Sequence, residues 1–273
     1  MLGLSVAVAD EGALPSAFVV WRGFEGSFYK AGKYGYNGVE LALRRASDIN
    51  PGKLDGMLRE NGLVVSAIST GQVFAEGGLC LTHEDAKIRA KAIEVLTALI
   101  QMSGEYGKVL NLGRVRGSIF SGQSEGYFIE SAQILCAEAE KYGVTVILEP
   151  VNRYEINFIN SLDEGVALIK KSGLHSLKLM PDVFHMNIED DSITGSFERN
   201  RDYVHYIHLA DSNRLAPGWG HLDFNIIFEC LRNIGFSGWL SAEILPKPSA
   251  DEAAKQAADY LLPYIKQGGK VIV

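Results

Sequence analysis

Short apolar runs alternate with longer amphipathic segments along the whole chain. Eight of the runs have the length and apolar content typical of buried strands. They are Leu4–Ala9, Gly38–Leu43, Leu63–Ser69, Lys108–Leu112, Val144–Leu148, Leu177–Met180, Val204–Leu209 and Trp239–Ile244. Between them, apolar residues recur at spacings of three and four, which is the period of an α-helix. The clearest helical segments are Glu84–Ser103, Gly126–Tyr142, Ser161–Lys171, Asp223–Ile234 and Asp251–Gln267.

The ends of several helices can also be located. Thr82 stands before Glu84 and Asp85, so we expect Thr82 to cap a helix whose first turn carries the two acids. Glycines follow helical segments at the points where a left-handed residue commonly ends a helix. These glycines are Gly107, Gly143, Gly173 and Gly235.

Strands that alternate with helices predict a parallel sheet, and eight such repeats favour a (β/α)8 TIM barrel. A doubly wound open sheet is less consistent, because no glycine fingerprint follows the first strand. No Pro-rich or Ser-rich linker divides the chain, so we expect residues 1–273 to form a single barrel domain.

Composition narrows the classes of function. The 273 residues carry a net charge of −7, which argues against a protein that binds nucleic acid through its phosphates. No apolar stretch reaches the length of a membrane span, and the N-terminus lacks the basic region of a signal peptide. Three widely spaced cysteines form no CxxC pair, which is typical of small buried side chains in a reducing compartment. We therefore expect a cytoplasmic enzyme.

Four polar residues stand directly after or within the last four apolar runs. They are Glu149, Asp182, His208 and Glu243, separated by 33, 26 and 35 residues. Parallel strands bring their carboxyl ends to one rim of a barrel, where these side chains would converge. Three buried negative charges are prohibitively costly together unless a cation compensates them. The pattern predicts one divalent metal ion, and oxygen ligands with one imidazole suit Mn²⁺, Mg²⁺ or Co²⁺.

A metal beside two carboxylates is suited to proton-transfer chemistry next to a carbonyl group. A cation at a carbonyl oxygen and its neighbouring hydroxyl would stabilise an enediolate, formed when the carbon between them loses its proton. Epimerisation needs a proton removed on one face and returned on the other, and Glu149 and Glu243 form the natural acid/base pair. Aldose–ketose isomerisation on a single face remains an alternative.

Longer motifs surround these residues, and together they resemble a known family. The EPVNRYE run begins at Glu149, the DVFHMNIE run at Asp182 and the HLADSNRLAPGWGHLDF run at His208, and SAE ends at Glu243. They resemble the xylose isomerase-like TIM barrels, in particular the metal-dependent ketose 3-epimerase and sugar-phosphate isomerase/epimerase branch. The resemblance implies a sugar or sugar-acid substrate, a preference for manganese or cobalt, and a homodimer or homotetramer.

The resemblance also implies substrate contacts. Glu155 and His185 fall where the family binds the reacting end of the sugar, and Arg214 where it holds an oxygen beside the metal. Two alternatives stay open: His185 could be a packed histidine, and Glu155 could pair with Arg214.

Three further residues are candidates for specificity. The segments Ser69–Gln72, Leu81–His83 and Gly113–Gly117 are most similar to bacterial enzymes that act on ketoses, such as tagatose or psicose, or on keto-aldonates such as 5-keto-gluconate. We include Gln72 among the substrate contacts on this basis. Arg116 is a candidate for a distal carboxylate or phosphate, or else a surface arginine. Trp219 could line the sugar site, or pack within its loop.

Other functions were weighed against the epimerase. A DNA-repair AP endonuclease of the related trinuclear type needs histidines after the third and fourth strands, where Ser69–Gln72 and Leu112–Val115 have none. A hydroxypyruvate-type isomerase and an inosose dehydratase-like lyase stay possible within the superfamily. A sugar-binding barrel without activity is disfavoured by the intact set of ligands.

Overall fold

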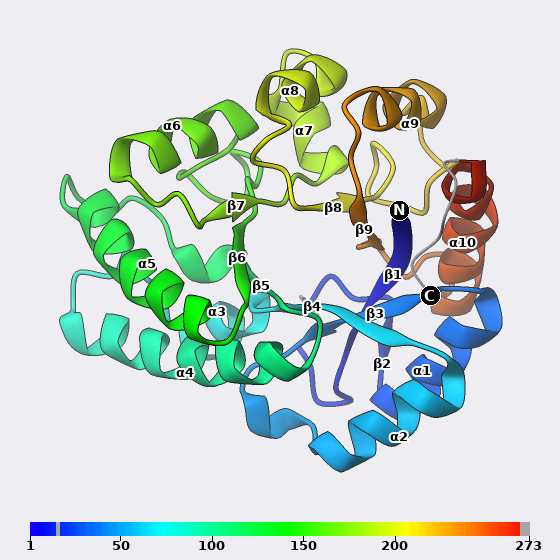
Figure 1. Cartoon of the computed structure of the whole chain (residues 1–273), viewed down its shortest axis with the longest axis horizontal. Coiled ribbons are helices and arrows are strands. Elements are labelled where there is room, and N and C mark those ends of the chain that lie inside the picture. Colours follow the sequence, from blue (N-terminus) through cyan, green and yellow to red (C-terminus); the bar gives the residue numbers. More distant parts are fainter. Residues whose placement is uncertain (15–16, 268–273) are drawn as a thin grey trace.

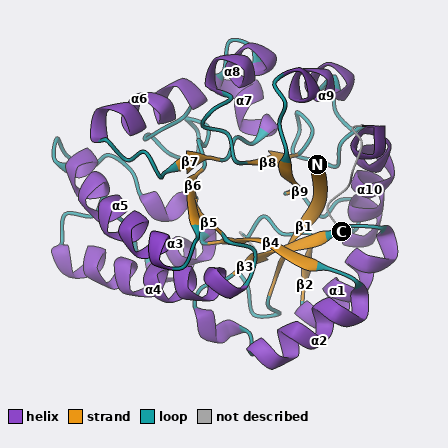
Figure 2. Ribbon diagram, in the orientation of Figure 1, coloured by secondary structure: helices purple, strands orange, loops and turns teal. Residues whose placement is uncertain are grey.

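Eight parallel strands form a nearly closed barrel inside a ring of helices (Figures 1 and 2). The structure is a computed structural model, and it describes residues 1–14 and 17–267. The barrel strands are β1 (Leu2–Ala9), β3 (Gly38–Ala42), β4 (Val64–Ser69), β5 (Val109–Leu112), β6 (Thr145–Leu148), β7 (Lys178–Leu179), β8 (Tyr206–Leu209) and β9 (Gly238–Ala242). The (β/α)8 prediction is confirmed, with every predicted strand present within a few residues of its expected bounds.

The strands follow one another around the barrel in the order β7-β6-β5-β4-β3-β1-β9-β8. The seam between β7 and β8 is held by isolated bridges, Leu179 to Val204 and Asp182 to His208. A two-residue strand, β2 (Trp21–Arg22), pairs with β1 and was not predicted, because two residues carry no periodicity.

Ten α-helices lie between and outside the strands in the described part of the chain (Figure 1). They are α1 (Phe24–Tyr34), α2 (Pro51–Asn61), α3 (Gly71–Gly77), α4 (Ala86–Glu105), α5 (Ser124–Lys141), α6 (Leu162–Ser172), α7 (Val183–Glu189), α8 (Ile193–Asn200), α9 (Phe224–Asn233) and α10 (Ala250–Gln267). Two single 3-10 turns, Ala46–Asp48 and Arg114–Arg116, interrupt loops at the barrel rim. Every helix that the structure describes is too short or too polar to span a bilayer.

The expected cap of α4 is wrong. The helix begins at Ala86, and the residue before it, Asp85, accepts a hydrogen bond from the backbone N–H of Lys87 at 2.8 Å. Thr82 lies fully buried three residues earlier, where the chain is still a turn. An aspartate next to the first helical residue satisfies a free N–H as well as a threonine does, so composition alone did not separate the two.

Inside the barrel, below the rim, a group of polar side chains surrounds the hydroxyl of Tyr206. The hydroxyl of Tyr206 lies 2.9 Å from Ser5 Oγ, 2.7 Å from Ser66 Oγ and 3.0 Å from Glu40 Oε2. The three cysteines are buried and unpaired, as expected. The prediction of one domain over residues 1–273 includes residues 15–16 and 268–273, which lie outside the described part, and it stays a prediction.

Two of the predicted helix-ending glycines offer a matched test of the fold. Gly107 and Gly143 have φ values of 79° and 63°. A Cβ on Gly107 would lie 2.9 Å from Val65 O, whereas a Cβ on Gly143 would meet nothing within 4 Å. We expect Gly143→Ala to cost about 1–2 kcal/mol for the left-handed backbone, and Gly107→Ala to cost more because the clash adds to it. Urea unfolding of both variants measures the difference, and equal losses would contradict the packing argument.

Candidate metal centre and substrate pocket

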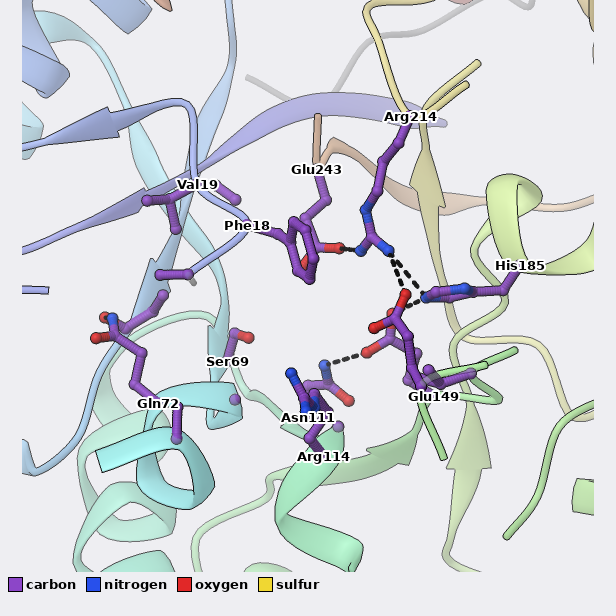
Figure 3. Close-up of a pocket in the computed structure, with 18 residues that line it drawn as sticks. Phe18, Val19, Ser69, Gln72, Asn111, Arg114, Glu149, His185, Arg214 and Glu243 are labelled. Atoms are coloured by element: carbon purple, nitrogen blue, oxygen red, sulfur yellow. Dashed lines mark hydrogen bonds and ion pairs between the residues drawn. The ribbon is translucent and has the colours of Figure 1, made fainter. Parts of the chain in front are cut away.

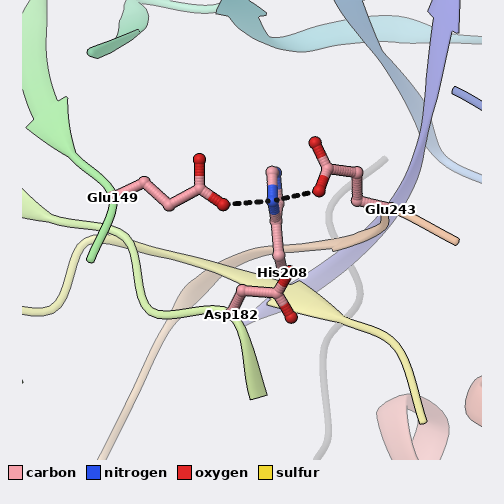
Figure 4. Close-up of side chains that lie close together, drawn as sticks. All are labelled: Glu149, Asp182, His208 and Glu243. Carbon is pink, nitrogen blue, oxygen red and sulfur yellow. Dashed lines mark ion pairs between the residues drawn. The ribbon is translucent and has the colours of Figure 1, made fainter. Parts of the chain in front are cut away.

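Four side chains meet at the carboxyl-terminal rim of the barrel (Figure 4). Glu149 follows β6, Asp182 follows β7, His208 lies in β8 and Glu243 follows β9. One donor atom from each lies within 4.8 Å of the other three. Metal–oxygen bonds of about 2.1 Å place opposite ligands about 4.2 Å apart, so a small contraction would close this set around one ion.

The two carboxylate oxygens of Asp182 have different roles: one caps a helix and the other faces the site. It is the N-cap of α7, and its Oδ1 accepts a hydrogen bond from the backbone N–H of Phe184 at 2.9 Å. The other oxygen, Oδ2, is buried and has no hydrogen-bond partner. The helix cap therefore holds the carboxylate in place and leaves one oxygen free toward the other three ligands.

His208 is held in the same way by a residue that the sequence analysis missed. Its Nε2 lies 2.9 Å from Oε2 of Glu40, a fully buried carboxylate in β3. Its Nδ1 is buried without a hydrogen-bond partner and lies 3.4 Å from Glu149 Oε1 and 3.6 Å from Glu243 Oε2. When Nε2 donates to Glu40, Nδ1 presents its lone pair to the carboxylates, as a carboxylate-bound histidine does at a metal.

The pKa shifts within this cluster indicate that its negative charges need a compensating positive charge. Burial raises the pKa of the Asp182 carboxyl to about 7, although the charges of Arg214 and His208 oppose the shift. Burial alone would lower the pKa of His208, but the negative charges of Glu40 and Glu243 outweigh it and raise that pKa well above its usual range. Acids and an imidazole that perturb one another in this way fit a divalent cation, which would neutralise the carboxylates and take the place of the proton on His208 Nδ1.

Arg214 is the main protein cation at the centre. Its guanidinium lies between the rings of Phe18 and Phe184, at 3.8 Å and 4.9 Å from their centroids. It donates to Glu243 Oε2 at 2.6 Å and to Glu155 Oε1 at 3.1 Å. The predicted alternative, a pair between Glu155 and Arg214, is therefore present, and both side chains also line the cavity.

His185 faces the same cavity from α7. The amide nitrogen of Asn152 donates to its Nδ1 at 2.7 Å, and because Arg214 Nη1 lies farther from Nε2, at 3.5 Å, the ring proton of the neutral form is placed on Nε2. That Nε2 lies 4.0 Å from Glu149 Oε1 and 3.9 Å from Asp182 Oδ2. Burial, aided by the charge of Arg214, lowers the pKa of His185 well below its ordinary value. The ring is therefore neutral and can donate one hydrogen bond into the site.

The cavity beside these ligands has walls of different character (Figure 3). Acids, His185 and Arg214 gather on one side. Small apolar side chains from the ends of β1 and β3 and the loop after β1 form another wall, together with Phe18. Polar residues at the ends of β4 and β5, and in the segments that follow them, complete it: Ser69, Gln72, Asn111 and Arg114. A polar metal end and a partly apolar wall match the faces of a sugar.

Of the three specificity candidates, only Gln72 lines this cavity. Trp219 is half-buried, packs against the hydrophobic core and is not among the lining residues, which agrees with the alternative that it packs within its loop. Phe18 and neighbouring apolar residues provide the apolar wall of the cavity instead. Phe18 was missed because a single aromatic residue in a loop carries no signal of its direction.

Arg116 does not line the cavity either, and it is not at the surface. Arg116 is fully buried, and its guanidinium donates to backbone carbonyls of Phe158 at 2.8 Å, Glu149 at 2.5 Å and Ile159 at 3.0 Å. Burial lowers its pKa to about 10. Arg116 thus ties the segment after β6, which carries Glu149, to the barrel rim. The cavity receives Arg114 from the same 3-10 turn.

Comparison with known proteins agrees with this architecture. A family model described as xylose isomerase-like TIM barrel matches residues 28–264. This chain belongs to that family. The L-ribulose 3-epimerase of Mesorhizobium japonicum is 30% identical over 224 residues, 80% of this chain and 74% of the relative. The D-psicose 3-epimerase of Ruminiclostridium cellulolyticum is also 30% identical, over 77% of this chain and 74% of the relative.

The fold similarity extends over the whole barrel. A solved structure of an L-ribulose 3-epimerase matches with a TM-score of 0.82 and 23% identity, covering 98% of this chain and 96% of that one. Both of the curated relatives named above are epimerases, a class of isomerase. The family membership predicted from the motifs around Glu149, Asp182, His208 and Glu243 is therefore confirmed.

Glu40 offers a test of this xylose isomerase-like site that does not depend on turnover. We expect Glu40→Gln to weaken Mn²⁺ or Co²⁺ binding roughly tenfold to a hundredfold, because His208 loses the carboxylate that fixes its proton. Isothermal titration of the folded protein measures the affinity. Glu25→Gln, an exposed acid in the first turn of α1, is the control and should bind metal as the parent does. Unchanged affinity in Glu40→Gln would rule out this role.

The buried guanidinium of Arg116 predicts a loss of stability in this member of the family. Arg116→Met removes the side-chain donors of the Phe158 and Glu149 carbonyls, whereas the Ile159 carbonyl keeps the backbone N–H of Val151, so we expect the free energy of unfolding to fall by roughly 2 kcal/mol or more. Chemical denaturation measures the change. Arg153→Met, which removes an exposed arginine on the same segment, should leave stability nearly unchanged. A fully stable Arg116→Met protein would show that the carbonyls find other partners.

Proposed function

We propose that this protein is a divalent-metal-dependent epimerase of a keto-sugar or keto-sugar acid. The main support is the position of two carboxylates, Glu149 and Glu243, on either side of His208 in the proposed ligand set (Figure 4). Their distances to His208 Nδ1, 3.4 Å and 3.6 Å, are nearly equal. The epimerases of other organisms that resemble this chain support the same class of reaction.

The residues of the rim are suited to hold the ion through Glu149, Asp182, His208 and Glu243. When bound, a divalent cation supplies the positive charge that polarises a carbonyl and stabilises the developing oxyanion. We propose manganese as the preferred ion, with cobalt or magnesium as substitutes. The oxygen-rich ligand set with one imidazole supports this choice over a thiolate-type zinc site.

Glu149 and Glu243 would exchange protons with the substrate from opposite faces. One carboxylate removes the proton from the reacting carbon, and the electron pair passes into an enediolate. The other delivers a proton to the opposite face, which inverts the centre. Burial would raise the pKa of Glu243, but His208 and Arg214 outweigh it and hold that pKa at about 2. Glu243 is therefore ionised and available as the base.

Glu155, His185 and Arg214 would orient the reacting end of the sugar. The guanidinium of Arg214 is fixed by two aromatic rings and two carboxylates, so its position costs no further ordering when substrate binds. The neutral His185 can donate from Nε2 to a substrate oxygen. We also propose that the protein is a homodimer or homotetramer, as the family resemblance implies.

The decisive experiment is a screen of ketoses and keto-sugar acids with the Mn²⁺-loaded protein in D₂O, followed by NMR. Epimerisation places solvent deuterium at one inverted carbon, because the carboxyl group that delivers the new proton has exchanged its own proton with D₂O. Deuterium at C1 of an aldose-derived ketose would instead identify an aldose–ketose isomerase. Elimination of water from the substrate would indicate a lyase, and lack of turnover across both substrate classes would contradict the proposal.

The two glutamates allow a sharper test. Glu149→Gln and Glu243→Gln should each lower epimerisation by at least about 10²–10⁴-fold, since each variant loses an acid/base group as well as a ligand. Glu94→Gln, an exposed acid in α4, serves as the control for folding and assay. Retained proton exchange without inversion in one variant would support the two-face mechanism. Near-native epimerisation by both variants would exclude it.

A further inference from the structure

One side of the cavity holds polar groups that the proposed mechanism does not use. Gln72 follows β4, and Asn111 and Arg114 belong to the end of β5 and the turn after it. Figure 3 shows these three away from Arg214 and His185, across the space that a substrate would occupy. The unused acceptors and the charge of these three side chains indicate the kind of ligand that they could bind.

Gln72 presents an unfilled acceptor. Its Nε2 donates to the backbone carbonyl of Ala42 at 3.0 Å, and because a carbonyl can only accept, the orientation of the amide is fixed. Its Oε1 is buried without a hydrogen-bond partner, although the side chain lines the cavity and is only 3% exposed. A buried acceptor left in this state costs free energy until a donor reaches it.

Asn111 repeats the arrangement closer to the metal ligands. Its Nδ2 lies 3.3 Å from Glu149 Oε2, an acceptor that again fixes the amide, and its Oδ1 is buried without a partner. Two oxygens on this wall therefore have no donor from the described protein and can accept hydrogen bonds from a ligand. The hydroxyl groups of a sugar chain are donors of this kind.

Arg114 adds a cation whose charge no described carboxylate neutralises. Its guanidinium carbon lies 5.5 Å from the centroid of Phe74, and no side chain that the structure describes forms an ion pair with it. Arg214, across the cavity, is already paired with Glu155 and Glu243. Arg114 is half-buried at the cavity wall, so an anion that reaches it is partly shielded from water.

We propose that Gln72, Asn111 and Arg114 form a distal subsite that selects acidic keto-sugars, with the substrate carboxylate on Arg114 and its hydroxyls on the two amide oxygens. The inference rests on the proposed function, and it names the substrate class of the same site. A carboxylate takes two parallel N–H donors from one guanidinium. A phosphate dianion has three acceptor oxygens, and this wall offers it a single cation beside two unfilled acceptors that would repel it.

The test compares substrates that differ at one carbon. The Mn²⁺-loaded protein is assayed by deuterium incorporation with 5-keto-hexonates, with the ketohexoses related to them by reduction of the carboxylate, and with ketohexose 6-phosphates. Binding of gluconate and of glucitol, which cannot react, is measured by calorimetry. The variants are Arg114→Gln and Arg114→Lys. Arg153→Gln removes a nearby exposed cation that does not line the cavity and serves as the control.

We expect the parent to prefer the 5-keto-hexonates at least tenfold in kcat/KM. Arg114→Gln should lose roughly tenfold to a hundredfold on them and less than about threefold on the neutral ketohexoses. Arg114→Lys keeps the charge but not the planar guanidinium, so its loss of kcat/KM on the 5-keto-hexonates should lie between those of the parent and Arg114→Gln. If Arg114→Gln does not fold, Arg114→Lys takes its place in the comparison. Arg153→Gln should keep the parent's preference.

Other outcomes separate this inference from the proposed function. A parent that prefers neutral ketohexoses or ketohexose phosphates, or equal losses by Arg114→Gln on both classes, would overturn the carboxylate subsite and leave the epimerase intact. Gluconate binding that depends on Arg114, without turnover of any keto-sugar, would support the subsite and contradict the epimerase. If the protein neither binds gluconate nor turns over any keto-sugar, the subsite is overturned together with the proposed function.

Discussion

Negative charge concentrated at one buried rim is the constraint on which the rest of the site depends. Parallel strands deliver Glu149, Asp182 and Glu243 to the same point, and water is too scarce there to solvate them. The protein holds two of the four candidate ligands, Asp182 and His208, by one atom and leaves another atom free. Asp182 caps a helix with one oxygen, and His208 is held by Glu40 through one nitrogen. The free atoms are the orphaned ones, which is the arrangement expected of a site completed by a cation.

The sequence predicted those parts of the site whose signal is local. A polar residue after an apolar strand marks the barrel rim, so the four ligands could be found without coordinates. Glu40 was not found, although a single acid in the apolar run Gly38–Leu43 is visible in the sequence. Its partner, His208, lies 168 residues away, and only the arrangement of β3 and β8 around the barrel brings the two together. Contacts of this range depend on register, which composition does not encode.

Arg114 and Arg116 are a clearer example of what the sequence could not predict. They lie two residues apart in one 3-10 turn, have the same chemistry and carry no periodic signal. The backbone turns one guanidinium toward the carbonyls of the segment after Glu149 and the other toward the cavity. The sequence analysis named Arg116 in this turn and made no prediction for Arg114. In the structure Arg116 supports the rim, whereas Arg114 lines the cavity wall.

The charges of the cavity explain why one arginine could decide substrate choice. Glu149, Glu155, Asp182 and Glu243 bring four negative charges, and the two guanidiniums of Arg114 and Arg214 bring two positive ones. A bound dication would add two positive charges to this set. Arg214 is committed to Glu155 and Glu243 and cannot serve a further anion without giving up a partner. Removing Arg114 would make the metal-loaded cavity more negative by one charge, which disfavours a substrate carboxylate and affects a neutral ketose little.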